Sequence, residues 1–347
     1  MYRFLKKEST ACVNGVFILI VFISHLRNYM VLEPHLEWAM KGLSQLMVAM
    51  FLFYSGFGVM ESIEKKGMTY VRQIPLHRVL RVLAMYIPAV LLYGLLDLIL
   101  GIPFTTGQFF LSLVAWLNLG NSNWYIFVIL CLYLITWVAW MIADKISGLR
   151  HRDETNASDY RDTWGWILTL ILSAGLILVL RQTTPEYYYN TISAYLFGLF
   201  FSQNKDCILR ACGFDKSGKL VSLRAKTAYV IMTVLMIGTV ICLRLLYPHG
   251  WSQIVFLLMT VFFCMAVVLL SYLVPFPDCV FRWFGEHLFE VYILMRLPMM
   301  ALQRVPGWEQ GGVWYALSCL AITVILAWIF HAVSRFFQDR LRSRTSS

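Results

Sequence analysis

The chain has 347 residues, of which 59% are hydrophobic and only 14% are charged, and its formal net charge is +10. Soluble globular domains carry about 25% charged residues, so this composition excludes an ordinary soluble domain and indicates a membrane protein. A charge of +10 would suit a nucleic-acid partner, but the distribution of the basic residues argues against one.

Long apolar stretches recur along the whole chain. A membrane-spanning helix needs about 20 apolar residues. The sequence predicts spans at residues 12–31, 38–60, 79–101, 124–143, 164–181, 189–203, 227–247, 253–273, 287–303 and 313–334. A further stretch, 107–118, is too short to span and is predicted to be re-entrant or interfacial. We therefore expect an all-α polytopic membrane protein with about ten transmembrane helices, residing in the cell membrane.

The loops between these spans alternate in basic charge. If the N-terminus is cytoplasmic, 23 of the 29 Lys and Arg residues fall on the inner side, many of them in the polar loops 144–163 and 204–226. This asymmetry follows the positive-inside rule and predicts that both termini are cytoplasmic. The positive net charge is therefore explained by the membrane topology and by contact with membrane lipids. We expect no nucleic-acid partner. Neither polar loop is large enough for a core of its own, so we predict a single membrane domain over residues 1–347.

The first apolar segment contains one histidine, His25. At about 1.5 Å per residue, it lies roughly two-thirds of the way across a hydrocarbon core of about 30 Å. Asn14 lies eleven residues earlier on the same helix face, and helical spacing also places Asn28 near that face. One interpretation is a general acid or base in a water-accessible cavity. The other is a packing histidine bonded to a neighbouring helix, with Arg27 reaching to the interface.

Several motifs, taken in order, resemble the integral-membrane acyltransferase 3 family. Residues 14–25 resemble its first helix, in which a basic residue precedes an apolar run and a histidine. The later matching segments are Phe53 to Gly58 (FYSGFG), His77 to Leu83 (HRVLRVL), Asn123 to Ile126 (NWYI) and Gly285 to Leu294 (GEHLFEVYIL). The resemblance covers residues 10–335. Three positions differ from the family pattern: its basic residue is Asn14 here, a serine is Leu288, and a histidine is Met295.

The resemblance implies an O-acyltransferase that moves an acyl group, in this family usually acetyl, to a hydroxyl of the bacterial envelope. The expected partners are an acyl-CoA donor and an envelope glycan or glycolipid acceptor, with no bound cofactor. His25 is the expected catalytic residue, acting either as a general base or as a transient acyl carrier. The predicted substrate contacts are Asn14, Asn28, Trp124, Tyr125 and Tyr292.

Two further pairs of neighbours are candidates on the donor side. Arg78 and Arg81 lie near the cytoplasmic start of the predicted third helix, where helix N-termini favour anions. They either hold the phosphates of acyl-CoA, together with Arg72, or only anchor the topology. Ser55-Gly56 either allows close helix packing or supplies an oxyanion contact through Ser55.

Acidic residues inside the apolar segments call for partners. Glu290 either pairs with a basic residue of another helix or orients a histidine, as in a catalytic pair. Asp97 is expected to pair with an outer arginine, and His331 to lie at the interface. No cluster of His, Cys, Asp and Glu has metal-ligand spacing, so no metal site is expected, and the eight cysteines are expected to be reduced.

Two functions therefore remain open. The first is the membrane O-acyltransferase. The second is a non-catalytic or carrier-type membrane protein for a lipid-linked sugar or another anionic substrate. The neutral residue at Asn14 and the outer arginines favour the carrier, whereas the ordered motifs favour the enzyme.

Overall fold

The computed structural model describes residues 2–31, 34, 37, 40, 43–150, 154–246, 252–273, 279–308 and 311–345. Every regular element in these residues is a helix, and they contain no strand. The helices fall into two compact units, each built from several separate stretches of chain. The first unit comprises Met1–Thr10, Val48–Leu80 and Val128–Pro275, and the second comprises Ala11–Met47, Arg81–Phe127 and Phe276–Ser347.

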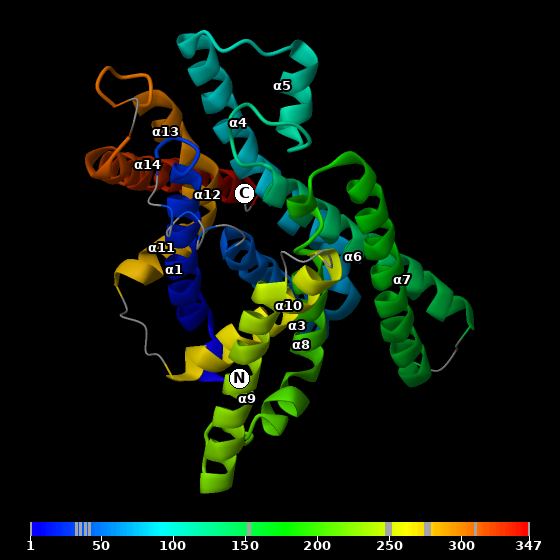
Figure 1. The fold of residues 1–347 in the computed structure, drawn as a ribbon. Coiled ribbons are helices and arrows are strands. Elements are labelled where there is room, and N and C mark those ends of the chain that lie inside the picture. Colours follow the sequence, from blue (N-terminus) through cyan, green and yellow to red (C-terminus); the bar gives the residue numbers. More distant parts are fainter. Residues whose placement is uncertain are drawn as a thin grey trace. The chain divides into compact units, whose positions relative to one another are not determined.

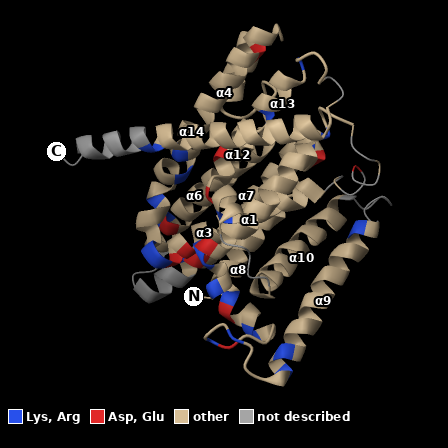
Figure 2. Ribbon diagram, turned by 90° about the vertical axis from the view of Figure 1, so that its left-hand side faces the viewer, with Lys and Arg blue, Asp and Glu red and all other residues tan. Residues whose placement is uncertain are grey.

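The first unit contains most of α3 (Leu43–Ile74) and α6 (Trp124–Arg150), and all of α7 (Glu154–Thr183), α8 (Ile192–Ala211), α9 (Leu223–Leu246) and α10 (Ser252–Leu273). Short turns of other helix types are η1 (Arg3–Leu5), η2 (Pro75–Leu80) and η3 (Glu186–Tyr188). Helix α10 packs along α9 and also contacts α8 and η1 (Figure 1). In Figure 2, the basic residues of α9 lie near its two ends, and residues 227–243 between them carry no charge. This pattern is typical of a helix that crosses a bilayer.

The second unit contains most of α1 (Lys7–Leu26) and all of α4 (Arg81–Leu100), α5 (Thr106–Leu113), α11 (Val280–Glu286), α12 (Leu288–Leu294), α13 (Arg296–Leu302) and α14 (Val313–Thr345). Helix α14 packs against α12 and α13, and α4 packs against α5, α12 and α13. Helix α4 ends at Gly101, which has φ +67°. The N–H of Ile102 donates to the carbonyl of Asp97 at 2.8 Å, a bond that satisfies one of the last helical carbonyls.

Helices α1 and α11 meet through two glycines. A Cβ on Gly15 of α1 would collide with the backbone carbonyl of Phe281 in α11. A Cβ on Gly285 of α11 would likewise collide with the carbonyl of Ala11 in α1. The contact is reciprocal, so only glycine at both positions lets the two backbones approach this closely.

Seven helices among the described residues are long and apolar enough to cross a membrane. They are Lys7–Leu26, Leu43–Leu100, Trp124–Leu149, Tyr160–Thr183, Leu223–Leu245, Gln253–Leu273 and Val313–Arg335. The 58-residue stretch Leu43–Leu100 covers two predicted spans, and it is interrupted at Gly67, whose φ of +57° and ψ of −147° are not helical.

Two predicted spans differ from the structure. The predicted span 189–203 corresponds to helix α8, which runs from residue 192 to residue 211. The second half of α8 carries Gln203, Asn204, Lys205 and Asp206, and α8 is not among the seven apolar helices. The predicted span 287–303 is divided into α12 and α13, of seven residues each. Pro298 explains the break, because it has no N–H to donate to the carbonyl of Leu294.

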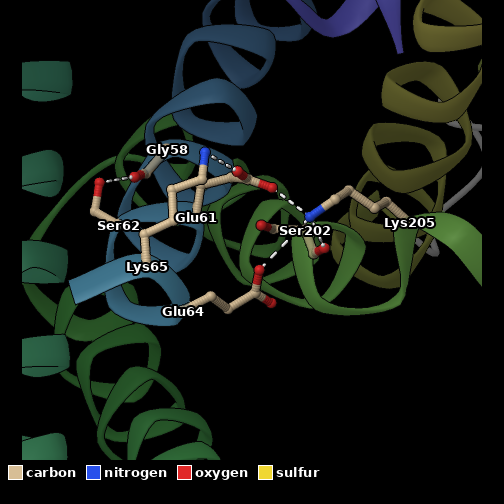
Figure 3. A network of polar contacts seen from close by, with 7 residues as sticks. All are labelled: Gly58, Glu61, Ser62, Glu64, Lys65, Ser202 and Lys205. Carbon is tan, nitrogen blue, oxygen red and sulfur yellow. Dashed lines mark hydrogen bonds and ion pairs between the residues drawn. The ribbon is translucent and has the colours of Figure 1, made fainter. Parts of the chain in front are cut away.

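A polar network joins α3 to α8 within the first unit (Figure 3). The carboxylate of Glu61, which is buried, forms ion pairs with Lys205 of α8 and, at 2.7 Å, with Lys65 of its own helix. The ammonium of Lys205 also donates to the carbonyl of Ser202 at 3.1 Å and lies 3.5 Å from Glu64. The charge count assigned both of these chain segments to the inner side, and the structure brings them together.

Candidate functional site

His25 lies in the last turn of α1 and is half-buried. Its backbone carbonyl accepts the N–H of Asn28 at 3.1 Å, in a turn that follows the end of the helix at Leu26. The predicted span continued to residue 31, and the alignment of Asn28 with the His25 face depended on that continuation. Because the helix ends earlier, the side chain of Asn28 is exposed in the turn.

Arg296 is the main charged neighbour of His25 in the second unit. Its charge and that of Arg27 both act on the imidazole. Arg296 is the first residue of α13 and is half-buried. Its Nε donates to the hydroxyl of Tyr29 at 3.0 Å, its guanidinium lies 5.6 Å from the centre of that ring, and its Nη1 donates to the carbonyl of Asn121 at 3.3 Å.

The segment before α6 is held by buried polar side chains. The amide nitrogen of Asn121 donates to the hydroxyl of Tyr86 at 2.7 Å, and its amide oxygen accepts the N–H of Leu119 at 2.9 Å. Asn123 donates to the carbonyls of Ala115 and Leu117 at 2.7 and 3.0 Å. These bonds fix the backbone carbonyl of Asn121 that Arg296 contacts. The polar run 121–123 between apolar stretches is the sequence signal for this buried loop.

Two predicted substrate contacts meet in the same unit. The rings of Tyr125 and Tyr292 pack edge to face, with centroids 5.3 Å apart, and both residues are buried. The Tyr292 hydroxyl shares a hydrogen bond of 3.0 Å with Ser122. Trp124, the first residue of α6, is half-buried and precedes Tyr125 in the chain. Tyr292 lies four residues before Arg296 in the chain. The aromatic pair therefore belongs to the same segment as the arginine that acts on His25.

Glu290 has a histidine partner, and that partner is His331. The Oε1 atom of Glu290 in α12 lies 2.6 Å from Nδ1 of His331 in α14. The ring of His287 packs against His331 at 4.5 Å between centroids and stacks on Trp283 at 4.3 Å. The structure therefore shows that Glu290 contacts a histidine of another helix, and a catalytic role for this pair stays a prediction. His331, expected at the interface, is tied to this carboxylate and keeps 27% of its side chain exposed.

Arg78 belongs to the first unit and already has aromatic partners. Its Nε donates to the hydroxyl of Tyr70 at 2.8 Å, and its guanidinium lies 6.0 and 5.7 Å from the ring centres of Tyr70 and Tyr133. The predicted helix N-terminus at this point is not present, because the π-helical turn Pro75–Leu80 connects α3 to α4 without a gap. Backbone N–H groups here are used within the helix, and Arg81 is exposed as the first residue of α4.

Ser55 and Gly56 lie in α3, also in the first unit. A Cβ on Gly56 would collide with the carbonyl of Tyr195 in α8, and one on Gly198 would collide with the carbonyl of Phe53. The glycine therefore serves close packing of α3 on α8, as one of the two interpretations predicted. The hydroxyl of Ser55 is half-buried, and its oxyanion contact stays a prediction.

Two polar side chains of the second unit lack the partners that a buried group requires. The amide oxygen of Asn14 is buried and accepts no hydrogen bond. The carboxylate of Asp97 is buried, its Oδ1 has no hydrogen-bond partner, and no ion pair with an arginine forms among the described residues. The expected pairing of Asp97 with an outer arginine is therefore absent from this structure.

No group of three His, Cys, Asp or Glu residues that could hold a metal ion occurs in the described part of the chain. Comparison of the chain with protein-family models, with curated proteins and with solved structures finds no match in any of the three. The resemblance to a family is carried by the sequence motifs alone, and function has to be argued from the site itself.

Proposed function

We propose that the chain is a multi-pass O-acyltransferase of the cell membrane, with about ten transmembrane helices and both termini in the cytoplasm. It would transfer an acyl group, most simply acetyl, from cytosolic acyl-CoA to a hydroxyl of an envelope carbohydrate or glycolipid. The observation that carries this proposal is His25, a half-buried imidazole in the last turn of an apolar helix that is long enough to cross a membrane. Ionisable groups at membrane depth mark functional sites.

The proposed chemistry needs one base, His25. His25 takes the proton from the acceptor hydroxyl, and the oxygen attacks the thioester carbonyl. The C–S bond then breaks, and the departing thiolate takes the proton from the imidazolium. In the variant route, the ring nitrogen of His25 first takes the acyl group and then passes it to the acceptor oxygen.

Donor binding in this proposal falls to the arginines of the chain segment that joins α3 to α4. Arg81 is exposed and is available to phosphate oxygens. Arg78 would have to hold a phosphate while keeping its contacts with Tyr70 and Tyr133. Ser55 is proposed as an oxyanion contact on the grounds of its motif alone.

A carrier of an anionic substrate is the second candidate. The observation in its favour is Arg296, a half-buried cation that forms no ion pair within the described residues. A carrier would bind the same anion but would leave it chemically unchanged. Covalent modification of the acceptor therefore separates the two functions.

The test is mass spectrometry of envelope glycans from cells that lack the gene, complemented with wild type, His25→Gln or His77→Gln. We expect acyl groups with wild type and with His77→Gln, since His77 is exposed in η2. We expect a loss of about 10²–10⁴-fold in rate with His25→Gln, the usual contribution of a general acid or base. Glycans that carry the same acyl groups with and without the gene would reject the enzyme and leave the carrier.

A further inference from the structure

The charge of Arg296 is not balanced by a carboxylate among the described residues of its unit. None of the carboxylates in the described residues lies within ion-pair distance of its guanidinium. Its contacts are the neutral hydroxyl of Tyr29 and the neutral carbonyl of Asn121. A half-buried cation in an apolar protein is costly unless it is paired, so a partner from outside the chain would relieve this cost.

Arg296 also has donors to spare. A guanidinium carries five N–H groups in a planar fork, and the two hydrogen bonds of Arg296 use one on Nε and one on Nη1. The contact with Tyr29 orients the fork from one side, while the remaining N–H groups have no acceptor among the described residues. A planar fork with free donors matches the two oxygens of a carboxylate or phosphate.

A second group nearby lacks a partner as well. The hydroxyl of Tyr93 in α4 is fully buried and completes no hydrogen bond. It approaches the backbone of Arg296 without reaching hydrogen-bond geometry. Buried hydroxyls are almost always hydrogen-bonded in proteins. An orphaned hydroxyl beside an unbalanced guanidinium is a donor set that an incoming oxyanion would complete.

Asp97 is the alternative candidate, within the same unit, for the counter-ion of Arg296. It lies four residues after Tyr93 on the same helix, and its carboxylate is buried with Oδ1 unpaired. It nevertheless forms no ion pair with Arg296. The other charged or titratable groups that act on this region are Arg27 and His25. The local field of Arg27 and Arg296 thus favours an anion.

We infer that Arg296, oriented by Tyr29 and assisted by Tyr93, binds the carboxylate or phosphate group of an anionic acceptor. This inference rests on the proposed function, because it names the substrate class of the same site. An oxyanion on Arg296 would place the rest of the acceptor beside His25. The acceptor is then an acidic sugar or a phosphate-bearing glycolipid, and a neutral sugar is a poor substrate.

The experiment measures ligand binding to the purified full chain in detergent, without acyl-CoA. The probes are sodium glucuronate for the carboxylate, dodecyl phosphate for a phosphate lipid, and methyl glucoside as the neutral sugar. We expect wild type to bind at least one anionic probe, and Arg296→Gln to weaken that binding about 10–100-fold, as expected for a lost charge-assisted hydrogen bond. Arg304→Gln is the matched control, since Arg304 is an exposed arginine of the same unit.

Two conservative variants keep the test decisive if Arg296→Gln fails to fold. Arg296→Lys retains the charge but loses the fork, so it should bind more weakly than wild type, and Tyr93→Phe should weaken binding with an unchanged fold. The inference is overturned if neither anionic probe binds wild type. It is equally overturned if Arg304→Gln loses as much affinity as Arg296→Gln, or if no variant at Arg296 or Tyr93 changes affinity. Anion binding without any acylation of envelope glycans would reject the enzyme but keep the anion site.

Discussion

Nδ1 of His331 lies 2.6 Å from Oε1 of Glu290, and this contact ties α14 to α12 across 41 residues of sequence. The carboxylate is only 4% exposed, whereas the imidazole keeps 27% of its side chain exposed. A buried carboxylate that loses its partner is left uncompensated, so the contact should stabilise the helix pair.

A double-mutant cycle should show this coupling. Glu290→Gln and His331→Ala should each lower the free energy of unfolding in detergent. The double variant should lose less than their sum, with a coupling energy of about 0.5–3 kcal/mol. Glu286→Gln is the control, because Glu286 forms an exposed pair with Arg282, and exposed pairs contribute about 0–1 kcal/mol. Strict additivity of the two single changes would contradict a direct contact between Glu290 and His331.

The paired glycines of α1 and α11 should be intolerant of a methyl group. Gly15→Ala and Gly285→Ala each push a Cβ into a backbone carbonyl, and we expect each to destabilise by about 1–3 kcal/mol, as overpacking does. Gly175→Ala in α7 is the matched control, because no atom lies within 4 Å of its added Cβ. It should be neutral or stabilise by up to about 1 kcal/mol. Thermal unfolding of the three variants in detergent gives the comparison, and equal stability of all three would refute the close contact.

The Lys205 network offers a similar comparison on the other unit. Lys205→Met removes the ion pair to buried Glu61 (Figure 3) and leaves that carboxylate with Lys65 alone. We expect a loss of about 1–3 kcal/mol in unfolding free energy, the cost of an under-satisfied buried polar group. Lys66→Met, at an exposed lysine of the same helix, should change stability by less than about 0.5 kcal/mol. Equal effects of the two substitutions would show that the network contributes nothing.

The sequence predicted the positions of most helices because long apolar stretches leave few alternatives in a membrane. Two contacts, Glu61 with Lys205 and Tyr29 with Arg296, join segments that the charge count assigned to one side, and the side itself stays a prediction. The sequence could not predict the partners of individual polar groups. Glu290 and His331 are brought together by tertiary packing alone, and no local pattern in the sequence encodes that contact.

The sequence also failed to predict where helices end or are interrupted. The π-helical turn at Pro75–Leu80 and the interruption at Gly67 depend on backbone angles that hydropathy does not report. They decide that Arg78 is enclosed by tyrosines rather than presented at a helix N-terminus. Similarly, the end of α1 at Leu26 moved Asn28 into an exposed turn.

The charge asymmetry predicts which side of the membrane each loop occupies. Lys216→Cys, in the loop between α8 and α9, should react with a membrane-impermeant thiol reagent only after the cells are permeabilised. Gly107→Cys, near the start of α5, should react in intact cells, because the predicted third span ends on the outer side. Both variants are made in a chain whose native cysteines are replaced. Labelling of Lys216→Cys in intact cells would invert the predicted topology.

Replacing Asn14 with a basic residue should improve binding of the acyl-CoA donor. The Asn14 amide oxygen is buried without a hydrogen-bond partner, so replacing the amide removes an unsatisfied acceptor. Asn14→Arg restores the basic residue of the resembled family, and arginine near a helix end can extend its head group toward the interface at limited cost. We therefore expect tighter acyl-CoA binding, measured as a lower dissociation constant by calorimetry on the purified protein.

The matched control for Asn14→Arg is Asn28→Arg, which adds the same charge at the exposed turn after the other end of α1. An equal gain in both variants would mean that added charge attracts the anionic donor from any position. Asn14→Lys, with a slimmer side chain, tests the same idea if arginine crowds the contact at Gly15. If neither Asn14 variant changes acyl-CoA affinity while both remain folded, position 14 takes no part in donor binding. The donor site would then be sought near Arg81 or in the 204–226 loop, which carries the exposed cations Lys216, Lys219 and Arg224.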